Sequence, residues 1–171
     1  MYLNRRELLT TNQRAELMKI SDDITQKELV YYYTLSIEDI DIISTYRLDY
    51  NKLGFVLQLT ILRHSGWPLV EFTNIPMKII NYVANQLDVD SKDFYKYFNR
   101  KNTKYEHLES ICKLFNYKKY NKNIETFLFD ELMLITQSET NSFRLVNYAL
   151  DILRKNKEIG RASCRERVFA G

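Results

Sequence analysis

Apolar residues in this chain recur at intervals of three and four positions, which is the period of an amphipathic helix. Ile37, Ile40 and Ile43 form one such stripe. The most apolar stretch is 51–63, where seven large apolar side chains cover most of the circumference of a helix. We therefore predict a central, buried helix over 51–63 that ends at Gly66.

Residues that can cap a helix stand before most of the other apolar stretches. Thr10 with Gln13, Thr25 with Glu28 and Thr103 with Glu106 have the spacing of a capping box. Ser36 and Ser91 are single N-cap candidates, and Asn116 is suited to a left-handed helix stop. The expected helices are 14–19, 29–33, 37–45, 51–63, 76–87, 92–98, 104–115, 124–136 and 140–156.

This pattern predicts an all-α fold, a multi-helix domain of about eight or nine short helices containing helix-turn-helix-like units. The 171 residues include only 4 Gly and 2 Pro, too few for the frequent turns of a sandwich or barrel. We expect residues 1–66 to form an N-terminal helical subdomain that ends in the buried central helix. Residues 67–157 would form a second helical subdomain.

Several classes of protein are disfavoured by what the sequence lacks. No apolar run has the length of a membrane span, and the first residues lack a secretion signal, so we expect a cytoplasmic protein without membrane partners. Two Cys and two His are too few for a closed metal site. There is no Gly-rich phosphate loop and no nucleophile elbow. We therefore predict no catalytic residue, no metal and no cofactor, and favour a binding module over an enzyme.

The last residues have a different origin from the rest. Residues 158–168 resemble the translation of a widely used sequencing adapter over eleven consecutive positions. We expect 158–171 to be a non-native tail that packs against nothing. The natural chain would then be interrupted near Lys157, and this sequence would be a fragment of a longer protein.

Positive charge is concentrated in one segment. Residues 92–122 contain nine basic and three acidic residues, a net charge of +6, whereas residues 1–49 have a net charge of −3. Such an asymmetry is typical of a single face that meets a polyanion. The basic residues are interleaved with tyrosines, whose hydroxyls can donate to phosphate or sugar oxygens.

Residues 80–98 have the spacing of a helix-turn-helix. Ala84 is a small residue where two helices would cross, Asp88 lies at the turn, and Phe94 would point inward. Asp88 stands where Gly is usual. This arrangement would present the outer face of 92–98, with Lys92, Tyr95 and Lys96, to a DNA groove.

The order of motifs resembles the N-terminal region of the Tn-three family of replicative transposases over residues 5–157. The matching positions are Tyr33-Thr34-Leu35-Ser36, Asp39, Ile43, Arg47, Asn51-Lys52-Leu53-Gly54-Phe55, Gln58-Leu59, Leu62-Arg63, Gly66, Gln86-Leu87-Asp88-Val89-Asp90, Tyr97, Arg100, Thr103, Glu106-His107-Leu108, Ile111 and Phe115-Asn116-Tyr117. The resemblance implies a bacterial, nucleoid-associated protein whose helical region binds the terminal inverted repeats of a transposon. The family's catalytic carboxylates lie in a downstream metal-dependent core, which is absent here. Oligomerisation is expected only in the full-length parent.

Three groups of residues are expected to serve this function. Arg100, Lys101, Lys104 and His107 would contact phosphates or base edges, with packing as the alternative role for His107. Lys92, Tyr95 and Lys96 would form the exposed recognition face. Arg47, Asn51, Lys52 and Arg63 would make a second contact or brace the fold. At 104, Lys stands where the family pattern has Arg, so the bidentate fork is lost.

The predicted partner is double-stranded DNA, at a transposon terminal inverted repeat. The alternative is a helical protein-interaction or regulatory domain whose basic patch meets an acidic partner. Salt-dependent binding to duplex DNA separates the two.

Overall fold

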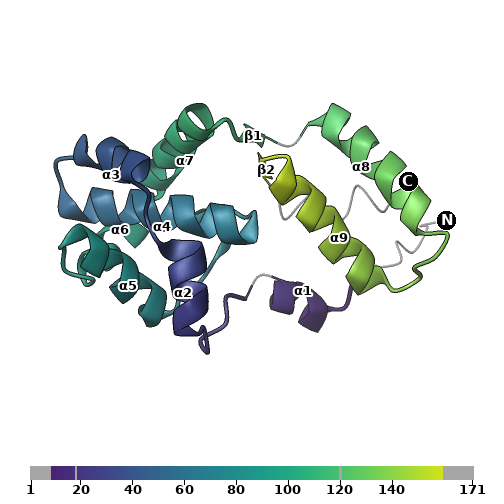
Figure 1. The fold of residues 1–171 in the computed structure, drawn as a ribbon, viewed down its shortest axis with the longest axis horizontal. Helices are drawn as coiled ribbons and strands as arrows, with labels where there is room; N and C mark the ends of the chain where they lie inside the picture. The colour runs from purple at the N-terminus through teal and green to yellow at the C-terminus, as the bar shows by residue number, and fades with distance from the viewer. Residues whose placement is uncertain (1–8, 18, 120, 160–171) are drawn as a thin grey trace. The chain divides into compact units, whose positions relative to one another are not determined.

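The chain forms two compact units, which the computed structural model describes over residues 9–17, 19–119 and 121–159. Residues 20–116 form the first, which we call the core unit. The terminal unit comprises the described residues before 20 and after 116. Figure 1 shows the helices of both units along the chain.

The core unit contains six α-helices and one turn of 3₁₀-helix: α2 (Gln26–Tyr33), α3 (Ile37–Ser44), α4 (Asp49–Ser65), η1 (Leu69–Glu71), α5 (Met77–Leu87), α6 (Asp93–Phe98) and α7 (Lys101–Phe115). The terminal unit contains α1 (Thr11–Leu17), β1 (Lys118–Lys119), α8 (Lys122–Ile135), α9 (Ser142–Lys155) and β2 (Glu158–Ile159). The described residues form nine α-helices, which confirms the prediction of an all-α fold with eight or nine helices. Within the described ranges, no helix is long and apolar enough to cross a membrane.

Helix α4 is the centre of the core unit. Every residue from Leu53 to Leu62 is buried, and α2, α3, α5, α6 and α7 all pack against it (Figure 1). The predicted buried helix is thus confirmed, and it extends two residues further at each end. It stops where Gly66 adopts the left-handed conformation, at φ 75°, which a residue without Cβ adopts at little cost.

Local capping explains the start of several helices. The Glu28 amide donates to Thr25 Oγ1 at 3.3 Å, and Glu28 Oε2 accepts from the Thr25 amide at 2.8 Å. Ser36 with Asp39 at α3, and Thr10 with Gln13 before α1, make the same reciprocal bonds. These boxes satisfy amide groups that the first turn of a helix leaves without partners.

Two predicted caps are wrong. Helix α7 begins at Lys101, so Thr103 lies inside its first turn, and the Lys104 amide already donates to the Arg100 carbonyl at 3.1 Å. The second is Ser91, the expected cap of α6. Helix α6 begins at Asp93, so its N-cap residue is Lys92, and the Lys92 side chain makes no capping hydrogen bond.

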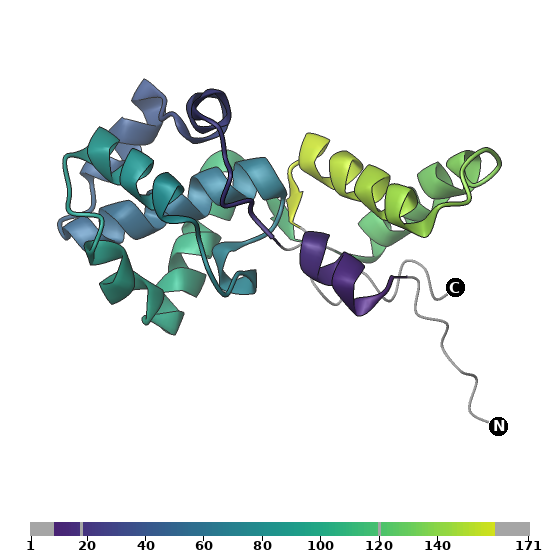
Figure 2. The same ribbon diagram turned by 90° about the horizontal axis from the view of Figure 1, so that it is seen from below.

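The two units differ from the expected division of the chain. Helix α4 packs against α5, α6 and α7, so the boundary expected at residue 66 falls inside the core unit. The expectation that residues 158–171 pack against nothing is wrong for its first two residues. β2 pairs in parallel with β1, and Ile159 is buried. Residues 160–171 lie outside the described residues. Figure 2 shows α8 and α9 of the terminal unit from a second direction.

Candidate nucleic-acid interface

The predicted recognition segment forms a short helix whose inner face is fixed in the core. Helix α6 buries Phe94 and Tyr97 and packs mainly against α4 and α7. The turn before it contains Asp88 in the left-handed conformation, at φ 53°. Asp tolerates this conformation better than most residues, which explains how it replaces the usual Gly. Tyr95 and Lys96 are exposed on the outer face, and Lys92 is exposed just before the helix.

Three exposed basic residues flank α6, one just before it and two at the start of α7, and none of them makes an ion pair with a carboxylate in the described part of the chain. These are Lys92, Arg100 and Lys101, which we call the corner cations. Lys96 differs from them, because its Nζ lies 2.6 Å from Asp93 Oδ1. The corner cations therefore present positive charge outside any ion pair, and the nearby carboxylates bind other groups: Asp90 accepts from the Lys92 amide at 2.9 Å and Asp93 pairs with Lys96.

Arg100 connects this corner to the start of α4. Its Nη1 donates to the Tyr50 hydroxyl at 2.8 Å, and its guanidinium carbon lies 5.3 Å from the centre of the Tyr50 ring. This contact places the first turn of α4 beside Arg100. Lys52 lies on that turn and pairs with Asp49 at 3.0 Å, while Arg47 is exposed in the loop before it.

Lys104 lies inside the core unit rather than at its surface. Only 8% of the residue is exposed, and Nζ lies 4.3 Å from the centre of the Phe98 ring. Burial lowers the pKa of Lys104, and the neighbouring charge of Lys101 lowers it further. Lys104 is therefore not the exposed side chain that the sequence predicted, because it lies on the face of α7 that packs into the core unit.

His107 is also a core residue. It is 6% exposed, its Nδ1 lies 3.1 Å from the Tyr97 hydroxyl, and its ring packs against Tyr46 and Phe55. Burial lowers the pKa of His107 to about 4, so the ring is neutral at pH 7. A neutral, buried imidazole offers no charge to a phosphate, and of its two expected roles the structure supports packing.

Sequence reasoning missed the polar network around His107. The Tyr97 hydroxyl donates to Gln58 Oε1 at 3.3 Å, and Gln58 Nε2 donates to the Lys104 carbonyl at 2.9 Å. The face of Tyr97 lies directly over Gly54, where a Cβ would collide with the ring. Gly54 could have indicated this contact, because an isolated glycine within an apolar helix often marks the close approach of another part of the chain.

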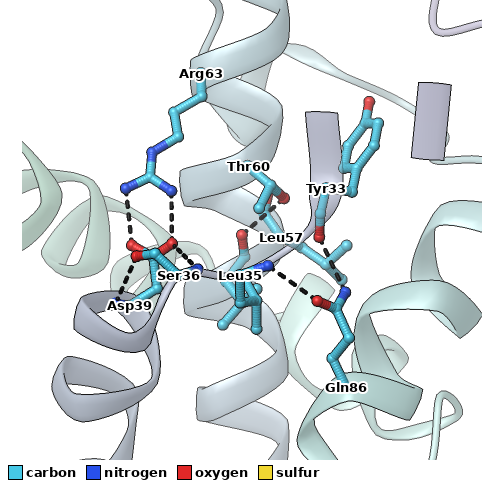
Figure 3. A network of polar contacts seen from close by, with 9 residues as sticks. Tyr33, Leu35, Ser36, Asp39, Leu57, Thr60, Arg63 and Gln86 are labelled. Atoms are coloured by element: carbon cyan, nitrogen blue, oxygen red, sulfur yellow. Dashed lines mark hydrogen bonds and ion pairs between the residues drawn. The ribbon is translucent and has the colours of Figure 1, made fainter. Parts of the chain in front are cut away.

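Arg63 braces the fold instead of extending the basic corner. Its guanidinium donates two hydrogen bonds to Asp39, at 2.7 and 2.8 Å (Figure 3). The same guanidinium lies over the Phe115 ring. Burial alone would raise the pKa of Asp39, but the hydrogen bonds from Arg63 and Ser36 outweigh it and hold the pKa below its ordinary value. The pair ties α3 to α4.

A second long-range contact holds the link between α2 and α3. Gln86 Oε1 accepts from the Leu35 amide at 2.9 Å, and Gln86 Nε2 donates to the Tyr33 carbonyl at 3.0 Å (Figure 3). Asn51, the remaining expected site residue, is half-buried in the first turn of α4. The exposed members of the expected site near α6 are thus Lys92, Tyr95, Lys96, Arg100 and Lys101. Near the start of α4, Arg47 is exposed in the preceding loop and Lys52 is partly exposed on the first turn.

The molecule is therefore an all-α protein built on one buried helix, with an exposed basic corner. Residues 8–159 match the family described as a domain of unknown function (DUF4158), and the chain belongs to this family. It is 33% identical over 154 residues to the transposase for transposon Tn1546 of Enterococcus faecium, covering 90% of this chain and 15% of the relative.

A second relative, the transposase for transposon Tn501 of Pseudomonas aeruginosa, is 30% identical over 155 residues, covering 91% of this chain and 16% of the relative. The chain thus spans about 15% of the length of these relatives. It corresponds to the N-terminal region of Tn-three family transposases, as the resemblance in its motifs predicted.

Proposed function

We propose that this chain is the DNA-binding region of a transposase and recognises the terminal inverted repeats of its transposon. The observation that carries the proposal is the exposed corner of Lys92, Arg100 and Lys101, whose charges have no carboxylate partner in the described residues. Its relatives are named as transposases, a class of protein that acts on DNA.

The chemistry of the corner suits a phosphate backbone. Lysine and arginine side chains neutralise phosphates and release the counterions condensed on duplex DNA. The exposed Tyr95 hydroxyl, which lies 3.6 Å from Met77 Sδ, can exchange that weak contact for a hydrogen bond to phosphate or sugar. Lys96 would add a further charge if DNA displaced it from Asp93.

Binding of a labelled duplex across a salt series tests this proposal. We expect the chain to bind duplex DNA at about 50 mM salt, with a slope of log K against log salt of about −0.9 per phosphate contact. Reversing the corner cations together, as Lys92→Glu, Arg100→Glu and Lys101→Glu, should abolish binding while helicity stays unchanged.

A matched control reverses the same number of exposed charges elsewhere: Lys19→Glu, Lys27→Glu and Lys155→Glu. This variant has the same net charge as the corner variant and should retain most of the affinity. Equal loss in both variants would mean that net charge alone attracts DNA. If the unsubstituted 171-residue chain, called the parent from here on, binds no DNA at low salt, the alternative function is favoured, in which a basic patch meets an acidic protein.

We also propose that this chain has no strand-cleaving activity of its own. Two-metal phosphoryl chemistry needs carboxylates clustered around the ions. Throughout the described ranges, no group of three or more His, Cys, Asp or Glu side chains could hold a metal ion. Incubation with Mg²⁺ or Mn²⁺ and a supercoiled plasmid should therefore leave the plasmid intact, and metal-dependent nicking that is lost in Asp41→Asn would contradict the proposal.

A further inference from the structure

We propose that Tyr50 is a positioning residue that orients the Arg100 guanidinium to read a guanine in bound DNA. This inference rests on the proposed function and assigns different roles to the corner cations. Arg100 would supply sequence discrimination, whereas Lys92 and Lys101 would supply attraction that does not depend on sequence.

The contact between these side chains leaves one edge of the guanidinium open. Nη1 donates to the Tyr50 hydroxyl at 2.8 Å, and this is the one hydrogen bond that the Arg100 side chain makes to the described residues. Nε–H and the adjacent Nη2–H lie on the opposite edge of the plane and form a second donor pair. Two parallel donors match the O6 and N7 acceptors of guanine in the major groove.

Arg100 is also held by its own backbone. Its amide donates to the Tyr97 carbonyl at 2.9 Å, and its carbonyl accepts the first hydrogen bond of α7, from the Lys104 amide at 3.1 Å. Tyr50 is half-buried in the first turn of α4. The backbone of Arg100 and its Nη1 are therefore both fixed, which reduces the rotamer freedom that the side chain loses when DNA binds.

The lysines of the corner are different. Lys92 and Lys101 are exposed and have no ion-pair partner in the described chain, and an ammonium is a point charge on a flexible stem. Such groups follow phosphates of any sequence. The Lys96 ammonium lies 2.6 Å from Asp93, so it reaches a base edge only after that pair breaks.

Selection from a library of duplexes with a randomised centre identifies the preferred sequence directly. The 171-residue chain selects duplexes at physiological salt, and the enriched duplex is then compared with single base-pair variants and with a random duplex. At one G·C pair, substitution should weaken binding by the parent about 5- to 150-fold.

Three variants then separate the roles. Arg100→Lys keeps the charge and should lose the discrimination at that G·C pair while binding the random duplex within about threefold of the parent. Tyr50→Phe keeps the ring but removes the hydrogen bond, and should lose part of the same discrimination at that position only. Lys101→Ala should weaken both duplexes equally and lower the salt slope by about 0.9.

The outcomes are distinguishable from failure of the proposed function. If the parent binds no duplex, the proposed function itself is wrong. If the parent binds DNA but no motif is enriched, or if Arg100→Lys preserves the discrimination, the reading role of Arg100 is overturned. If Tyr50→Phe lowers the melting temperature but leaves the base preference intact, Tyr50 has only a structural role.

Discussion

The core unit and the terminal unit bury their apolar side chains in different ways. The largest fully buried side chains, among them Trp67, Tyr33 and Tyr97, all belong to the core unit, where five helices surround α4. In the terminal unit, α8 and α9 each bury one face against the other, while Phe129 and Leu134 of α8 remain 46% and 67% exposed. A helix that is covered on all sides stabilises a fold more than a two-helix layer can.

The contacts between distant elements follow the same contrast. In the core unit, Asp39 pairs with Arg63, Gln58 bonds to the Lys104 backbone, and Gln86 bonds to the Leu35 and Tyr33 backbone. In the described terminal unit, the parallel pair of β1 and β2 is only two residues long in each strand. The basic corner is thus built on the more densely packed of the two units, and the proposed role of Arg100 depends on that support.

Equivalent leucine truncations in the two units should have unequal effects. Leu59→Ala, at a fully buried position of α4, should lower the free energy of unfolding by about 4 kcal/mol. Leu132→Ala, at a position of α8 that is 5% exposed, should cost about 2 kcal/mol, because the thin terminal unit can relax around the cavity. Hydrogen exchange of amides in α4 and α9 measures each unit separately. Equal loss of protection in both helices from either change would show that the units unfold as one.

Gly54→Ala tests how tightly the core unit is packed. Helix propensity alone predicts that Ala stabilises α4 by about 1 kcal/mol. The added Cβ would instead meet the ring of Tyr97, which the His107 and Gln58 contacts hold in place, so we expect a net loss of about 3 kcal/mol. Urea denaturation gives the sign. The double variant Gly54→Ala with Tyr97→Leu should cost less than the sum of the two single changes, and a stabilising single change would show that the ring can move.

Features that depend on near neighbours could be predicted from the sequence. The caps at Thr25 and Ser36 use partners three residues away, and the apolar period of α4 is a property of its own residues. The long-range contacts could not be predicted, because their partners are 24 to 53 positions apart in the chain. Many residues that carry the family resemblance, including Gly54, Gln58 and Arg63, make these contacts and therefore maintain the fold.

The candidate site could also be predicted only in part, because burial depends on contacts with residues that are distant in the chain. The excess of positive charge is a property of composition, but the exposure of each side chain depends on the register of α7. Lys104, His107 and Ile111 form the buried stripe of that helix, at spacings of three and four residues. Because Ile111 is apolar and faces the core, helical spacing places Lys104 and His107 on the same inward face. The contact between Arg100 and Tyr50 joins residues 50 positions apart, and no local pattern indicates it.

Acidification should weaken the core unit through His107. The pKa of this buried imidazole is lowered from 6.5 to about 4, so the unfolded chain binds a proton more readily than the folded chain between these values. Stability therefore falls as the pH falls below 6.5, and we expect a loss of about 1–2 kcal/mol between pH 7 and pH 5.

Urea denaturation of the parent and of His107→Gln at both pH values measures this effect. Glutamine does not titrate, so the variant should be less stable at pH 7 but lose less stability on acidification. A nuclear magnetic resonance titration should find the His107 ring still neutral at about pH 5.5, because its pKa in the folded chain is about 4. A ring that titrates near its ordinary pKa of 6.5 in the folded chain would show that it is solvated and accessible to DNA.

The smallest effects are expected at the end of the chain, where two truncations separate the contribution of β2 from that of the residues after it. A chain ending at residue 157 loses β2, and with it the burial of Ile159 and the weak pair between Glu158 and Lys118 at 3.6 Å. Because only these two described residues are removed from the edge of the fold, the terminal unit should lose about 1 kcal/mol and the core unit nothing. A chain ending at residue 159 keeps the strand pair and should melt at the same temperature as the full 171 residues, as expected if the remaining residues are translated adapter sequence.

Differential scanning calorimetry of the three chains gives both comparisons. A loss of several degrees in the chain ending at 159 would mean that residues 160–171 contribute to the fold, and equal stability of the two truncated chains would mean that the β1–β2 pair contributes nothing measurable.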